Sequence, residues 1–163
     1  EQAGTNPRVV DISADFRYPN AAAYEAVYKH AHGAPHRIAG FTCVNDVTAR
    51  DLQKTDGQWT RAKGFDTFCP AGPTVAEGLD WRALEVIGRV NGEERQRGRT
   101  SEMIFDIPHL LAYISAIMTL EPGDLVATGT PAGVGPLAPG DVVEVEIPGI
   151  GILSNPVRSD TQS

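Results

Sequence analysis

The chain has 163 residues, of which 41% are hydrophobic and 21% charged, a composition typical of one globular domain. Its formal net charge of −7 argues against a nucleic-acid-binding protein, which usually presents a basic face, and no stretch approaches the ~20 apolar residues of a membrane span. A small anionic substrate stays compatible with this composition, because a few local cations outweigh the sign of the whole chain.

The two cysteines, Cys43 and Cys69, lack the spacing of a metal site. They favour two buried thiols in a reducing compartment, and a single disulfide is the alternative. The first residues, EQAGTNPR, lack the basic and then apolar pattern of a signal peptide. We therefore expect a cytoplasmic protein.

The first 40 residues predict a strand, a turn and a helix. The strand-like run is VVDIS, and the helix covers about residues 20–32. A short helix is expected at residues 47–54. Further along, Asn91-Gly92 is a strong hairpin signal, because a type I′ turn needs positive φ at both positions. The strands expected in this later part cover residues 84–90, 93–97, 125–128, 142–147 and 150–155.

An amphipathic helix is expected after Asp106, which can cap it, with Pro108 in its first turn. We expect this helix to end near Leu120. Its apolar residues recur at spacings of three and four, so one face should pack on the core: Ile107, Leu110, Leu111, Ile114, Ile117 and Met118. These elements predict an α+β, β-rich domain with long loops.

The segment NDVTARDLQ gathers Asp46, Arg50 and Gln53. If residues 47–54 are helical, Asp46 is the N-cap, a structural role worth ~1 kcal/mol. Arg50 and Gln53 then share one face of the helix. The other interpretation makes the segment one wall of an anion and metal site, and the spacing alone leaves both open.

Lys63 lies in RAKGFDTFCPAGP, among small and aromatic residues. A partly desolvated lysine can neutralise an enolate, and Thr67 offers a hydroxyl group. The alternative is a lysine that extends past Phe65 and Phe68 to solvent. CPAGP is interpreted as a rigid turn without chemistry of its own.

The segment LVATGTPAGVGP predicts a strand that runs into a Gly/Pro loop holding Thr128 and Thr130. Such a loop can present backbone N–H groups and hydroxyls to a carboxylate or a phosphate. It contains neither the GxxxxGK[ST] nor the GxGxxG pattern, so the loop alone is a weak signal.

GFTCVNDVTARDLQ, DGQWTRAKGFDTFCPAGP, TSEMIFDIPHLLAYIS and LEPGDLVATGTPAGVGP occur here in the order of a known family. From about residue 38 to 157 the chain resembles the catalytic domain of the fumarylacetoacetate hydrolase family. The resemblance implies a mixed β-sandwich roll, usually a homodimer. It also implies Mg²⁺ or Mn²⁺ and the hydrolysis, decarboxylation or isomerisation of 2-oxo or β-diketo acids, in which the cation stabilises an enolate.

Carried over position by position, the resemblance implies that Asp46 binds the metal and that Lys63 lies near the metal and the enolate. The remaining implied positions face the substrate: Arg50, Gln53, Thr67, Gly129 and Thr130. The family's metal site also needs a Glu-x-Glu pair upstream of Asp46, and the only Glu residues before it are Glu1 and Glu25.

Residues 8–37 instead resemble a fragment of N-acetyl-gamma-glutamyl-phosphate reductase, in VVDISADFR and AAYEAVYKHAHGAPHRI. We therefore interpret the chain as a chimera: an atypical N-terminal segment (1–37), a catalytic domain (38–157) and a tail (158–163). Asp11, Ser13 and Asp15 would share one face of a strand, which makes Asp15 a candidate second metal ligand. The alternative is an edge strand with solvated aspartates.

Two functions follow from these observations. The first is a metal-dependent hydrolase, decarboxylase or isomerase of a small 2-oxo or β-diketo acid. The second is a catalytically impaired family member that lacks the Glu-x-Glu ligands and serves as a binding or dimerising scaffold.

Overall fold

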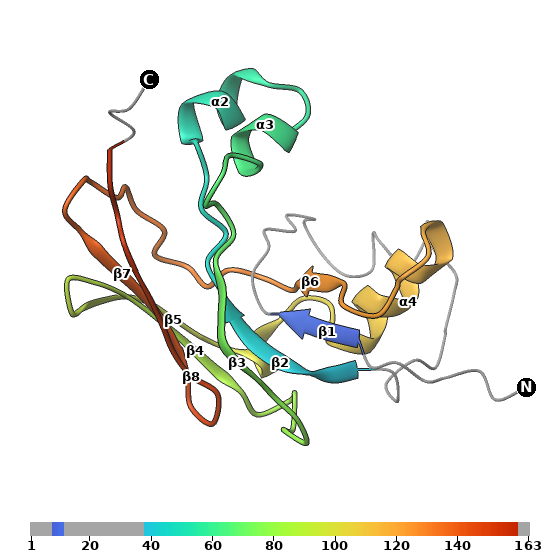
Figure 1. Cartoon of the computed structure of the whole chain (residues 1–163). Helices are drawn as coiled ribbons and strands as arrows, with labels where there is room; N and C mark the ends of the chain where they lie inside the picture. Colours follow the sequence, from blue (N-terminus) through green and yellow to red (C-terminus); the bar gives the residue numbers. More distant parts are fainter. Residues whose placement is uncertain (1–7, 12–37, 160–163) are drawn as a thin grey trace, which may run out of the picture.

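The computed structural model describes the backbone of residues 8–11 and both backbone and side chains of residues 38–159. The strands in these ranges form two four-stranded sheets, called sheet A and sheet B below, with helices at their margins (Figure 1). The expected α+β, β-rich class is confirmed. No helix among the described residues is long and apolar enough to cross a membrane.

Sheet A has the strand order β3-β2-β1-β6. Its strands are β1 (Arg8–Asp11), β2 (Ile38–Val44), β3 (Ala71–Ala76) and β6 (Leu125–Ala127). β1 pairs in parallel with both β2 and β6, whereas β3 runs antiparallel to β2. The interpretation of the N-terminal strand as an edge strand is therefore wrong, because β1 lies inside the sheet.

Sheet B is antiparallel, with the order β5-β4-β7-β8. Its strands are β4 (Glu85–Val90), β5 (Glu93–Arg99), β7 (Val142–Ile147) and β8 (Gly151–Pro156). The predicted hairpin is confirmed, since Asn91 and Gly92 have φ of 53° and 79° between β4 and β5. β5 has the sequence EERQRGR, and charged side chains on such an edge strand oppose further strand addition.

The helix predicted after Asp106 is α4 (Ile107–Ile117), and the backbone N–H of His109 donates to the Asp106 carboxylate at 2.8 Å. It ends three residues before the expected Leu120. Ile117 and Met118 are 61% and 59% exposed, so their predicted place in the core is wrong. The helix is shorter than its apolar pattern because Met118 already has an extended backbone.

The core joins both sheets to α4. Strands β2 and β3 contact β8, and β2 also contacts β7. The buried cluster takes side chains from each layer and includes Phe41, Cys43, Val86, Ile107, Leu111 and Ile147. Cys43 is a buried thiol, as expected, but Cys69 is an exposed thiol, and the two form no disulfide.

Two helical segments follow β2, namely α2 (Arg50–Thr55) and α3 (Thr60–Lys63). They project together beyond the end of β2, apart from α4 (Figure 1). α2 begins later than expected, and its N-cap is Ala49, so the predicted capping role of Asp46 is wrong. The rigid-turn interpretation of CPAGP is also incomplete, because β3 begins within it at Ala71. The helix predicted at residues 20–32 lies outside the described residues.

Candidate functional site

The candidate site is built at one edge of sheet A, where three parallel strands end. Asp11 of β1 is in register with Thr42 of β2 and with Ala127 of β6. The chain therefore leaves all three strands at the same edge, and in parallel sheets this carboxyl edge is where ligand-binding groups gather. Asp46 follows β2 and Thr128 follows β6, so the topology delivers both predicted segments to this region.

Asp46 makes a direct ion pair with Lys63, the last residue of α3. Their side chains are 24% and 28% exposed, so the pair is shielded but still reached by solvent. Backbone hydrogen bonds also hold the segment after Asp46 against α3. The N–H of Ala49 donates to the Ala62 carbonyl at 2.9 Å, and the N–H of Lys63 donates to the Trp59 carbonyl at 3.0 Å. A pair held in this way places a fixed cation close to the end of β2.

Arg50 and Gln53 lie on one turn of α2, as their spacing predicts. The Arg50 guanidinium donates to Gln53 Oε1 at 2.5 Å, and this contact is exposed. A second pair, Asp56 with Arg61, joins the end of α2 to α3 at 2.7 Å. The hydrogen bond from Arg61 lowers the pKa of the Asp56 carboxyl below its ordinary value.

The loop after Lys63 has an unusual backbone. Thr67 and Cys69 have φ of 69° and 58°, a region that side chains with a Cβ rarely adopt. The rings of Phe65 and Phe68 pack at 5.4 Å between centroids, and the N–H of Phe68 donates to the Phe65 carbonyl at 3.0 Å. Such strain is typical of functional loops. Thr67 itself is exposed, and its predicted role in substrate binding stays a prediction.

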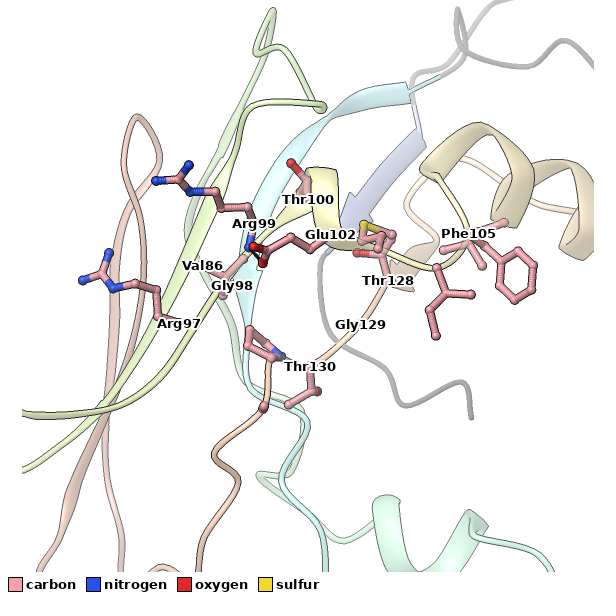
Figure 2. Close-up of a pocket in the computed structure, with 15 residues that line it drawn as sticks. Val86, Arg97, Gly98, Arg99, Thr100, Glu102, Phe105, Thr128, Gly129 and Thr130 are labelled. Atoms are coloured by element: carbon pink, nitrogen blue, oxygen red, sulfur yellow. Dashed lines mark hydrogen bonds between the residues drawn. The ribbon is translucent and has the colours of Figure 1, made fainter. Parts of the chain in front are cut away.

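Gly129 and Thr130 line a cavity of about 350 Å³ between the loop after β6 and the 3₁₀ turn Thr100–Glu102 (Figure 2). The guanidinium groups of Arg97 and Arg99 point away from Thr130 (Figure 2). Both guanidinium groups also pair with Glu85, at 2.7 and 3.6 Å. The lining of this cavity includes neither Asp46 nor Lys63. The structure thus unites Asp46 with Lys63 and Arg50 with Gln53, and places the Thr130 loop at a separate cavity.

Two buried polar atoms at this edge lack a hydrogen-bond partner: Asn45 Nδ2 and Thr128 Oγ1. Asn45 follows β2 directly, and its backbone N–H donates to Pro70 at 3.1 Å. Buried polar groups are nearly always paired, so such atoms indicate a place for water or a ligand. The sequence offered one signal for Asn45, its position between the apolar run FTCV and Asp46.

A divalent cation at Asp46 is implied by the family resemblance. Mg²⁺ needs near-octahedral oxygen ligands, and a protein usually supplies them as carboxylates supplemented by water and substrate. Within residues 38–159, no three His, Cys, Asp or Glu side chains lie together so that they could hold a metal ion. The Asp46 carboxylate is engaged by Lys63. The described residues therefore do not fit this metal site, and Asp15 lies outside them.

A model of the fumarylacetoacetate (FAA) hydrolase C-terminal family matches residues 23–158, which is most of the chain. The chain belongs to the fumarylacetoacetate hydrolase family. The crystal structure of 2-hydroxyhepta-2,4-diene-1,7-dioate isomerase from Mycobacterium marinum is similar, with a TM-score of 0.76 and 55% identity over 78% of this chain and 50% of that one. Family members named as enzymes are thus among its relatives.

Two further relatives carry names of related reactions. Oxaloacetate tautomerase YisK of Bacillus subtilis is 47% identical over 74% of this chain and 43% of its own length. The mitochondrial oxaloacetate decarboxylase of Dictyostelium discoideum is 45% identical over 69% of this chain and 55% of its own length. The chain spans about half the length of the curated relatives it matches.

The family match begins at residue 23, inside the segment that resembles the reductase. The relatives named above support the hydrolase-family assignment only, and none of them supports the chimera interpretation. The division at residues 37 and 157 stays a prediction.

Proposed function

We propose that the chain acts on a small 2-oxo or β-diketo acid through an enolate, as a tautomerase or isomerase, a decarboxylase or a hydrolase. The contact between Lys63 and Asp46 supports this function most directly. It sets a shielded ammonium group on α3, and α3 contacts α2, the helix that carries the donors Arg50 and Gln53. The names of relatives at 45–55% identity point to the same reaction class.

These reactions share one electronic requirement. When a proton leaves the carbon next to the keto group, or when a carbon–carbon bond to that carbon breaks, negative charge moves to the keto oxygen. A fixed cation that faces this oxygen stabilises the charge as it develops, and removal of one such donor typically slows a reaction about 10²–10³-fold. Lys63 is proposed for this task, and Asp46 holds its ammonium group in position.

The other residues bind and orient the acid. Arg50 and Gln53 present guanidinium and amide donors from one turn of α2, a pattern suited to a carboxylate. Thr67 is proposed to contact the substrate from the neighbouring loop. The resemblance assigns a second carboxylate group to Gly129 and Thr130, through main-chain N–H and hydroxyl donors, although their loop lines a separate cavity in this structure. We assign no reaction step to a metal, because the described residues do not complete a metal site.

Two further expectations belong to this proposal. We propose that the two packed sheets represent the family's β-sandwich roll, and that the chain forms a homodimer as the resemblance implies. Light scattering on the purified chain measures the second directly: a molar mass near twice 17.4 kDa supports it, and a monomer contradicts it.

A catalytically impaired scaffold is the second candidate. One observation favours it: among the residues that the structure describes, Asp46 belongs to no group of three metal-ligating side chains, whereas the resemblance implies three ligands. Such a chain would bind acids or self-associate without turnover. Activity assays separate this candidate from the enzyme.

The decisive assay follows oxaloacetate by its enol absorbance and by pyruvate formation, with 2-hydroxyhepta-2,4-diene-1,7-dioate as a second substrate. We expect Lys63→Met to lower kcat/KM by about 100-fold. Arg61→Met is the matched control on the same helix, with a side chain that is 62% exposed, and we expect it to stay within about twofold. No turnover of either substrate by the unmodified chain would support the scaffold.

A further inference from the structure

We propose that the Lys63 ammonium group takes the place of a divalent cation at Asp46 in this chain. Lys63, Arg50 and Gln53 then form a binding site for a small dicarboxylate anion that works without metal. This inference rests on the proposed function for the location of the site, but it concerns ion binding and not turnover.

The first support is geometric. Lys63 Nζ contacts Asp46 Oδ2 directly, and both side chains are about three-quarters buried. A dication bound to the same carboxylate would lie next to a fixed ammonium charge in a place where water screens poorly. Asp46 therefore already has a cationic partner, supplied by the chain itself.

The second support is the ligand count. Asp46 lies in no group of three metal-ligating side chains within the described residues. Before Asp46, the whole sequence contains Glu1 and Glu25 and no Glu-x-Glu pair. If Asp46 is the only carboxylate ligand, as among the described residues, a dication binds weakly, because Mg²⁺ gives up its water ligands reluctantly.

The third support is the local charge. Residues 45–63 contain four Lys or Arg and three Asp residues, a formal charge of 4 − 3 = +1, in a chain of net charge −7. Sites for dications are normally negative, whereas a local positive excess attracts anions. The sign of this segment therefore favours a carboxylate ligand over a metal ion.

The donors left over suit such a ligand. Gln53 accepts from Arg50 through Oε1, so its amide N–H groups stay available as donors. The exposed Arg50 guanidinium has further N–H groups beyond the one used. Because α3, which ends at Lys63, contacts α2, which carries Arg50 and Gln53, we propose that these donors together bind the two carboxylate groups of oxalate, a compact mimic of a 2-oxo acid enolate.

Calorimetric titration of the full chain with oxalate tests the inference, with one titration in EDTA and others in excess Mg²⁺ or Mn²⁺, corrected for metal–oxalate complexes. We expect the Kd to agree within about twofold across the three conditions. Lys63→Met should weaken oxalate binding by at least about tenfold, and Arg61→Met should leave it unchanged. Oxalate binding only when metal is present, or no oxalate binding in any condition, overturns the inference.

Asp46→Asn gives the sharpest contrast, because a metal-free site and a metal site predict opposite changes in oxalate affinity. The amide still accepts a hydrogen bond from Lys63 but removes a negative charge, so oxalate binding in EDTA should persist or tighten. At a metal site the same change abolishes binding. Circular dichroism and thermal unfolding confirm that each variant is folded. Oxalate binding in EDTA without turnover would support the inference and contradict the proposed function. Turnover that depends on metal would support the proposed function and contradict the inference.

Discussion

Lys63 at the end of α3 and Asp46 after β2 are seventeen positions apart in the sequence, yet their side chains form one ion pair. The pair connects the end of a sheet strand to the projecting helices α2 and α3. It is therefore both a structural link and the centre of the candidate site.

A double-mutant cycle measures the structural part of this link. We expect Asp46→Asn, Lys63→Met and the double variant to show a coupling free energy of about 1 kcal/mol in urea unfolding, because the pair is shielded but not fully buried. The control cycle uses the Asp56–Arg61 pair, in which the Arg61 side chain is 62% exposed, so we expect a smaller coupling. A larger coupling in the control than in the Asp46–Lys63 cycle would contradict the shielding argument.

Ile107 and Ile117 offer a matched comparison at the two ends of α4. Ile107 is fully buried, whereas Ile117 is 61% exposed. We expect Ile107→Ala to lower the free energy of unfolding by about 2–5 kcal/mol through lost burial and a new cavity. Ile117→Ala should change it by no more than about 0.5 kcal/mol. Chemical denaturation of both variants checks the assignment, and equal effects would place Ile117 in a buried contact.

Asp106 caps α4 through the backbone N–H of His109. Asp106→Ala should destabilise the chain by about 1 kcal/mol, and Asp106→Asn should cost little, because asparagine caps equally well. Thermal unfolding of the pair distinguishes capping from a charge effect. If the asparagine variant loses as much stability as the alanine variant, the charge is responsible and not the hydrogen bond.

Gly92 has a positive φ of 79° in the hairpin between β4 and β5, and nothing lies within 4 Å of an added Cβ. Gly92→Ala should therefore cost about 1 kcal/mol from backbone strain alone. Gly57 is the control, because its added Cβ also meets nothing and its φ is not in this region. Gly57→Ala should be neutral or slightly stabilising in the same unfolding assay.

The Asp56 carboxyl has a lowered pKa because Arg61 donates to it. A lowered folded-state pKa means that the contribution to stability is present above the ordinary value of 3.8 and is lost as the pH falls through the folded value. Carbon-13 NMR titration should show this carboxyl titrating below its ordinary range, and Arg61→Met should return it there. An unchanged titration in that variant would show that Arg61 is not the cause.

Local signals predicted the parts of the fold that local chemistry determines. The Asn91-Gly92 turn, the Asp106 cap and the bounds of β7 (Val142–Ile147) all follow from short-range sequence patterns. β3 escaped prediction because Gly72 and Pro73 indicate a turn, whereas pairing with β2 keeps the segment extended. The position of β1 inside sheet A likewise depends on partners that are distant in the sequence.

In the candidate site, too, local spacing was predictable from the sequence, whereas contacts between distant segments were not. Arg50 and Gln53 meet because helical spacing brings them together. Periodicity places Asp46 at a helix cap, but the contacts of Ala49 with Ala62 and of Asp46 with Lys63 delay the start of α2. The two unpartnered atoms of Asn45 and Thr128 could not be predicted as unpartnered from the sequence, since this depends on burial at the end of two strands; only the position of Asn45 after the apolar run FTCV was a signal.

β1 lies between β2 and β6 and pairs in parallel with both strands. Main-chain hydrogen bonds do not distinguish one side chain from another, so a segment of unrelated sequence can complete the sheet. The position between β2 and β6 therefore constrains the backbone of the sequence that occupies it more than its side chains. In this architecture the requirement that β1 completes the sheet and any chemical requirement at its carboxyl end can therefore be met independently of each other.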